Sequence, residues 1–257
     1  MAEYDRQTLN ARASSAAAID EGLRSYMLRV YNYMGIGLVV TGLVAYFANA
    51  AALTTNADAA VGQLANGTLV TQWGALLYTS PLAWVVMLAP LAFVMVLSFG
   101  INKMSVGTAQ LVFWAFAAVM GLSLSSIFLV YTGASISKVF FITAATFGAM
   151  SLYGYTTKRD LTQVGSFLIM GLFGLIIASI VNVIWPSGPL GFAISVVGVV
   201  IFLGLTAWDT QKIKESYSEG MGRDYETKGA VMGALSLYLD FLNLFLMLLR
   251  LFGQQRN

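Results

Sequence analysis

Two aspartates lie within or directly beside long apolar runs, and they are the residues best suited to chemistry in this sequence. Asp240 is near the middle of the apolar run 230–252, and Asp209 directly follows the run 190–208. An unpaired carboxylate in hydrocarbon is costly and tends to take up a proton instead. Two such groups close together cannot both ionise cheaply, so they would titrate as a unit. The two aspartates therefore predict a pH sensor.

Ser236 and Asn243 extend the polar face on which Asp240 lies. The three residues follow the i, i+4, i+7 spacing, so a helix over 230–252 places them on one side, facing partner helices or water. A simpler interpretation is that Ser236 and Asn243 only tie helices together by hydrogen bonds. Calcium takes about six to eight oxygen ligands, more than Asp209 and Asp240 supply. We therefore expect a transient calcium site on the two aspartates, completed by water, Asn243 and backbone carbonyls.

The composition excludes many other functions. Of 257 residues, 58% are hydrophobic and only 10% are charged, and the chain has neither cysteine nor histidine. A disulfide framework, a thiol nucleophile, a histidine base and the usual structural zinc site are therefore excluded. The 14 Lys and Arg residues barely exceed the 12 Asp and Glu residues, which does not fit a nucleic-acid partner. We expect neither enzymatic activity nor a resident cofactor.

The apolar runs predict an all-α membrane protein. Crossing a hydrocarbon core of about 30 Å takes about 20 apolar residues in a helix. Apart from Asp240 and Arg250, no charged residue lies in the runs of that kind. The sequence thus predicts a tail over 1–29, a transmembrane domain over 30–253 and a short tail over 254–257. The seven expected spans are 30–52, 82–101, 109–131, 139–155, 164–185, 190–208 and 230–252.

The basic residues predict the orientation in the membrane. Of the 14 Lys and Arg residues, all but Lys138, Arg250 and Arg256 fall on the side that holds the amino terminus. The positive-inside rule then places the amino terminus in the cytoplasm and the carboxyl terminus outside. The polar loop 53–81 would lie on the outer face, as a cap or a mobile segment. Arg250 is expected to extend to the outer interface without an ion-pair partner.

Several segments resemble the Bax inhibitor-1 family in its bacterial form. The segment 236–253 reads SLYLDFLNLFLMLLRLFG and resembles the last helix of that family, and the segment 204–214 reads GLTAWDTQKIK. Further similar segments start at Arg29 and at Gly121, so the resemblance covers nearly the whole chain. It is specific because it includes both aspartates in their sequence context.

The resemblance implies six helices around a central hydrophobic seventh, with an acid pair linking helices six and seven. Asp209 and Asp240 match that pair. It also implies a pH-sensitive calcium leak channel, here in a bacterial inner membrane, and one bacterial relative associates with a membrane-anchored protease. The family's closed-state latch includes an arginine on the second helix. The run 82–101 contains no charge and Lys103 follows its end, so the resemblance does not extend to that arginine.

Three functions from different classes remain open. The first is a calcium-permeable leak channel gated by protonation of Asp209 and Asp240, with the lipid bilayer, calcium and protons as its partners. The second is a membrane adaptor that binds a membrane-anchored protease or another membrane protein. The third is an intramembrane aspartyl protease. It is disfavoured because the sequences of such enzymes contain a tyrosine–aspartate pair and a Gly-x-Gly-Asp motif. This chain offers Trp208–Asp209 and Leu239–Asp240 instead.

Overall fold

The computed structural model describes residues 2–64, 67–218, 220 and 222–256, with only the backbone described for residues 2–20. Within these ranges, seven helical segments are long and apolar enough to cross a membrane. The prediction of an all-α membrane protein with seven spans is therefore confirmed. The helices that build the bundle are α1 (Ala2–Ala52), α3 (Leu82–Gly100), α4 (Val106–Leu124) with its short extension α5 (Ile127–Val130), α6 (Gly133–Thr156), α7 (Thr162–Ile184), α8 (Gly188–Glu215) and α9 (Arg223–Phe252).

Hydroxyl caps set where several of these helices begin. The side chains of Ser105, Thr132 and Ser187 each accept a hydrogen bond from a backbone N–H in the first turn of α4, α6 and α8. Such caps satisfy backbone donors that have no partner inside the helix. Helices α6, α8 and α9 extend beyond the predicted spans, because a helix continues through polar residues after its apolar run has ended.

Helix α1 does not break where the sequence suggested a change from tail to span. It runs without interruption through Ala2–Ala52, and its candidate spanning segment is Glu21–Ala52. The predicted boundary at residue 29/30 therefore marks a change in composition within one helix. Among the described side chains, the single ion pair joins Arg29 of α1 to Glu226 of α9 at 3.4 Å.

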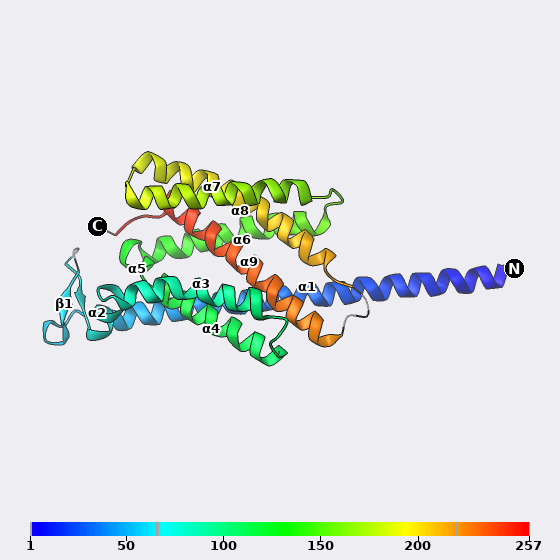
Figure 1. The fold of residues 1–257 in the computed structure, drawn as a ribbon, viewed down its shortest axis with the longest axis horizontal. Coiled ribbons are helices and arrows are strands. Elements are labelled where there is room, and N and C mark those ends of the chain that lie inside the picture. The colour runs from blue at the N-terminus through cyan, green and yellow to red at the C-terminus, as the bar shows by residue number, and fades with distance from the viewer. Residues whose placement is uncertain (1, 65–66, 219, 221, 257) are drawn as a thin grey trace.

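Helix α9 occupies the centre of the bundle, as predicted (Figure 1). It packs against α1, α3, α4, α6 and α8. In the most apolar 18-residue stretch of α9, 67% of the residues are buried, against 11% in the corresponding stretches of α3 and α7. Helix α3 packs mainly on α4, and α7 packs mainly on α8, so these two helices form opposite outer walls.

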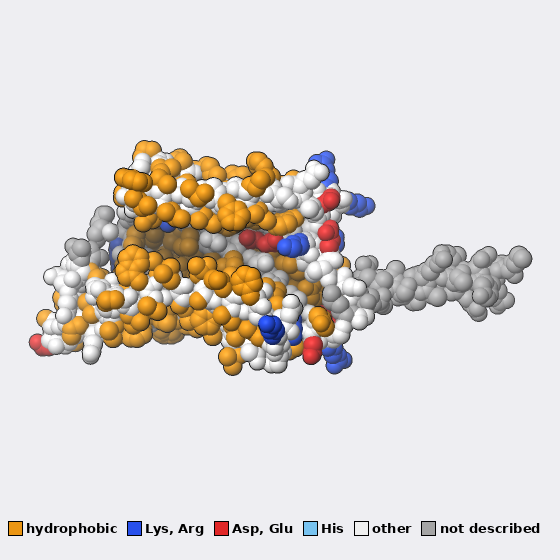
Figure 2. All heavy atoms as spheres, in the orientation of Figure 1, with side chains coloured by type: hydrophobic (Ala, Val, Ile, Leu, Met, Phe, Trp, Pro, Cys, Tyr) orange, Lys and Arg blue, Asp and Glu red, His pale blue; other side chains and the backbone are white. Residues whose placement is uncertain are grey.

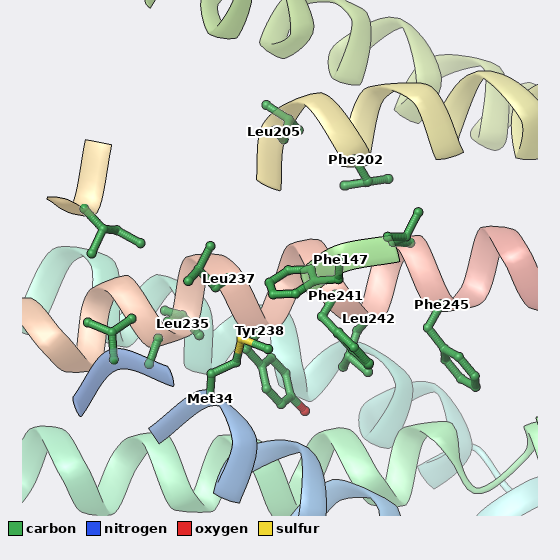
Figure 3. Packing of buried hydrophobic residues seen from close by; sticks show 14 of the residues in the cluster. Met34, Phe147, Phe202, Leu205, Leu235, Leu237, Tyr238, Phe241, Leu242 and Phe245 are labelled. Carbon is green, nitrogen blue, oxygen red and sulfur yellow. The ribbon is translucent and has the colours of Figure 1, made fainter. Parts of the chain in front are cut away.

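Aromatic rings fill the core on both sides of α9. The ring of Tyr238 contacts the rings of Phe113 and Phe116 of α4 edge to face, and Phe241 contacts Phe147 of α6 in the same way. In Figure 3, Tyr238 is directed away from Phe202 and Leu205 of α8. Edge-to-face pairs add to the stability that burial gives, so α9 is held by close packing on several sides.

The two ends of the bundle differ in the elements they carry. The loops α3–α4, α6–α7 and α8–α9 lie at one end, where the amino-terminal part of α1 leaves the bundle, and we call it the amino end (Figure 1). The opposite, carboxyl end carries the small hairpin of β1 (Gly62–Gln63) and β2 (Leu69–Val70), helix α2 (Gln72–Tyr78) and the chain terminus. The terminal residues are held there by pairing of Gln255 with Tyr131.

Candidate functional site

The fold brings Asp209 of α8 and Asp240 of α9 together. Their carboxyl groups lie within hydrogen-bonding reach of each other. The side chain of Asp240 is buried, with 6% of the residue exposed, and that of Asp209 is partly buried. The Oδ2 atom of Asp240 has no hydrogen-bond partner in the described part of the chain. A buried, unpaired carboxylate oxygen is uncommon in proteins and marks a candidate site.

Both carboxyl groups line a cavity of about 900 Å³. Helix α7 forms one wall, Leu91 of α3 lies on the other side, and α8 and α9 form the floor. The cavity exists because the outer walls α3 and α7 each pack on a different neighbour. Figure 2 shows it as a hollow between two layers of hydrophobic side chains, with acidic and basic atoms toward the amino end.

Ser236 and Asn243 line the same cavity, so the whole polar face of α9 turns toward it. The amide of Asn243 donates a hydrogen bond to the carbonyl oxygen of Leu239, one turn earlier in the same helix, at 2.8 Å. This bond uses the Asn243 donor within α9 and ties no other helix. The simpler interpretation expected Asn243 to join two helices by a hydrogen bond. In the described structure its amide donates within α9 instead.

The oxygens at the site are few for a tight calcium site. Among the described residues, no group of three or more acidic, histidine or cysteine side chains comes together. If each carboxylate binds through one oxygen, the two carboxylates, one amide oxygen and one hydroxyl supply four ligands, fewer than the about six to eight oxygens that calcium takes. A cation held here would keep much of its water.

Lys212 and Trp208 belong to the site and were not singled out from the sequence. Lys212 lines the cavity, and its Nζ atom lies 5.1 Å from the centre of the Trp208 ring. Its charge also attracts the carboxylate of Asp209, one turn earlier in α8. The i, i+3 spacing of Asp209 and Lys212 could have indicated this pair. Trp208 packs directly against Gly165, whose missing side chain lets α7 approach.

Hydrogen bonds fix α8 to the helices behind it. The Gln211 side chain accepts from the backbone N–H of Leu161 and donates to the carbonyl oxygen of Arg159, both at 2.8 Å. Lys214 donates to the carbonyl oxygen of Tyr155, also at 2.8 Å. These bonds attach the last turns of α8, at the amino end of the bundle, to the end of α6 and to the α6–α7 loop. A chain of hydroxyls adds to them through Tyr31, Ser151 and Thr210.

The contact between α8 and α9 has fewer polar interactions. Within the described ranges, the contact between the carboxyl groups of Asp209 and Asp240 is the one polar interaction between side chains of these two helices. The remainder of that interface is apolar packing. Lys103, the basic residue after α3, does not line the cavity, and α3 itself carries no charge. In the described structure, α3 therefore supplies no basic side chain to this cavity.

Comparisons with known proteins match nearly the whole chain. The family model described as inhibitor of apoptosis-promoting Bax1 matches residues 23–257. The inner membrane protein YbhL of Escherichia coli is 45% identical over 248 residues, covering 95% of this chain and 98% of the relative. An uncharacterised protein of Rickettsia prowazekii, RP147, is 45% identical over 244 residues and covers 95% of both chains.

A third relative, from Caulobacter vibrioides, is 46% identical over 242 residues, or 93% of this chain and 92% of its own length. The similarity thus covers nearly the whole chain in each of the three relatives, and the range matched by the family model includes both aspartates. The resemblance seen in the sequence is confirmed, and this chain belongs to the Bax inhibitor-1 family.

Proposed function

We propose that this protein is a calcium-permeable leak channel that is gated by protonation of Asp209 and Asp240. When the pair shares one proton, a hydrogen bond between the carboxyl groups holds α8 against α9 and closes the path. When both groups are ionised, they repel each other, attract a cation and separate the two helices. Proton loss therefore opens the channel, and calcium flux rises with pH.

The observation that supports this proposal most is the contrast between the two sides of α8. Hydrogen bonds of Gln211 and Lys214 attach α8 to the end of α6 and to the α6–α7 loop. On the side of α9, the polar link in the described structure is the carboxyl pair alone. Since apolar packing in lipid has no strong orientation of its own, a single protonation event can shift the balance at this interface.

The charge distribution supports an orientation of the bundle in the membrane. Because basic residues gather at the amino end, we place that end in the cytoplasm and the aspartate pair in the cytoplasmic half of the bilayer. The relative named an inner membrane protein supports a bacterial inner membrane as the location. With this orientation, a calcium gradient directed into the cell would drive calcium from the carboxyl end to the amino end.

The test measures calcium entry into dye-loaded proteoliposomes across about pH 6 to 8. The native protein should show flux that rises with pH, whereas Asp209→Asn, Asp240→Asn and the double substitution should remove most of that dependence. Asp224→Asn is the matched control, because Asp224 lies in the first turn of the same helix α9 and does not line the cavity. It should leave the pH dependence unchanged.

Two results would contradict the proposal. One is folded, reconstituted native protein that gives no flux above empty liposomes at any pH. The other is a pH dependence that survives the double substitution. The first result would point to the adaptor function, for which retention of a partner protein after the double substitution is the expected behaviour.

A further inference from the structure

A second pocket lies at the carboxyl end of the bundle, away from the aspartates. It has a volume of about 380 Å³ and is enclosed by the end of α7, the start of α8 and the end of α9. Its lining includes the guanidinium-bearing Arg250 together with Ser195, Asn182 and Tyr131. Arg250 has no ion pair or hydrogen bond with any residue in the described ranges. A cation without an acid partner at a membrane face favours an anionic ligand.

This pocket borders the cavity that holds the aspartates. Ser179 and Val183 of α7 line both, so the two spaces adjoin at these residues. From there toward the amino end, the α7 wall consists of apolar side chains such as Ile176 and Ile180, both exposed. The result is one groove with a basic, polar head and a long apolar body, which opens on the face of the bundle shown in Figure 2.

Charge decides which way a ligand would lie in this groove. Arg250 supplies positive charge at the carboxyl end, whereas Asp209 and Asp240 line the far end of the apolar body. An anionic group is attracted to the first position and repelled from the second. A molecule with an anionic head and an apolar tail therefore fits in one direction only. The volume of the apolar body, about 900 Å³, is in the range of about 300–1,000 Å³ for ligand sites.

We propose that this groove binds one anionic phospholipid, with its phosphate at Arg250 and an acyl chain along α7 toward the aspartates. Exposed apolar side chains of α7 line the groove, so it would face hydrocarbon in a membrane that the seven described candidate spans cross, and phospholipid is the most abundant molecule there. This inference goes beyond the channel proposal, because binding of a lipid does not require transport of an ion.

Native mass spectrometry of the purified full-length protein in detergent tests the site directly. The protein is mixed with phosphatidylglycerol, phosphatidylcholine or glycerol 3-phosphate. One phosphatidylglycerol should bind about tenfold more tightly than phosphatidylcholine, and Arg250→Gln should remove this preference. Lys138→Gln is the matched control. It removes another exposed basic side chain near the carboxyl end that lines neither cavity, so it should change nothing.

A second pair of variants tests the apolar part of the groove. Ser179→Phe places a ring where the two cavities meet and should reduce phosphatidylglycerol binding about tenfold. Ser166→Phe on the same helix is the control. Both serine hydroxyls donate to the carbonyl oxygen four residues earlier, but Ser166 lines neither cavity. Circular dichroism and thermal unfolding establish that all four variants are folded.

Three results would overturn the proposal. Equal binding of the two lipids that Arg250→Gln does not change would show that no anionic head is recognised. Displacement of the lipid by glycerol 3-phosphate at similar concentration would show that a soluble phosphate compound is the ligand. Loss of binding in both serine variants would show that the lipid lies on the outer surface of α7 and not in the groove.

Discussion

Tyr238 and Asp240 are two residues apart on α9, and both are buried, yet they differ in whether their polar atoms have hydrogen-bond partners. The Tyr238 hydroxyl pairs with Oγ1 of Thr41 at 2.6 Å, and that Thr41 atom also bonds to the carbonyl oxygen of Ala117 at 2.8 Å. Asp240 keeps one carboxylate oxygen without any partner in the described structure. The first residue faces α1 and α4, and the second faces α8 and the cavity.

The difference separates a structural polar group from a candidate functional one. A buried network in which each member has its partner is rigid and joins the helices that contribute to it. A buried acid with a free oxygen beside a cavity can gain a partner when a proton or a cation arrives. We therefore expect the Tyr238 side of α9 to determine stability and the Asp240 side to determine the response to pH.

The largest effect is expected for Tyr238→Ala. The substitution removes a fully buried ring and its hydrogen bond to Thr41, so it should lower the free energy of unfolding by about 3–5 kcal/mol. Thermal unfolding of the purified protein in detergent measures the loss. Tyr153→Ala is the control, because Tyr153 is 45% exposed on α6. Equal losses for the two variants would show that the Tyr238 network does not hold the bundle.

A smaller effect is expected for Gly154→Val, which tests how closely α8 is held from behind. A side chain at Gly154 would overlap the backbone of Ala207, two residues before Asp209, and should cost about 1–3 kcal/mol. Gly148→Val on the same helix is the control, since nothing lies within 4 Å of a side-chain carbon there. A comparable loss of thermal stability in both variants would show that general helix propensity is responsible.

Asp240→Asn should change the free energy of unfolding by less than about 1 kcal/mol, because the free carboxylate oxygen has no hydrogen bond to lose and an amide is cheaper to bury than a charge. The same variant is expected to remove most of the pH dependence of flux. A loss of stability as large as that of Tyr238→Ala would show that Asp240, like Tyr238, is a structural residue.

The smallest effect concerns Asp160, an exposed acid between α6 and α7 that has its partners. Hydrogen bonds from the side chain and the backbone N–H of Thr162 lower the pKa of Asp160. Its contribution to stability is therefore present above the usual pKa of an aspartate and is lost as the pH falls through the lowered value.

Thr162→Ala removes the side-chain bond and should raise the pKa of Asp160 toward its usual value, as followed by carboxyl carbon NMR. Thr156→Ala is the control, because the Thr156 hydroxyl bonds only to backbone carbonyls of its own helix. An unchanged titration in Thr162→Ala would show that the hydroxyl does not stabilise the Asp160 carboxylate.

Hydropathy predicted the spans because a bilayer imposes one requirement on every crossing helix. It did not predict that α1 continues from Ala2 or that α9 begins at Arg223, since those ends depend on caps and on contacts beyond the hydrocarbon. The helical spacing placed Ser236, Asp240 and Asn243 on one face, and all three line one cavity.

The remaining parts of the site arise from packing between distant segments. The cavity forms because α3 and α7 pack on different neighbours, and no local pattern records that arrangement. Gln211 illustrates the same limit. Its side chain bonds to the backbone of Leu161 and Arg159, about fifty residues earlier in the chain, and neither carries a distinctive side chain for the purpose.

The central position of α9 has a consequence for biosynthesis, because this helix leaves the ribosome after the helices that surround it. Until residues 223–252 are inserted, the earlier helices have no partner for the surfaces that face α9. The incomplete bundle would present these surfaces to lipid or to insertion factors. Chains that terminate early should therefore be substrates for membrane quality control, even when six of their spans are already in place.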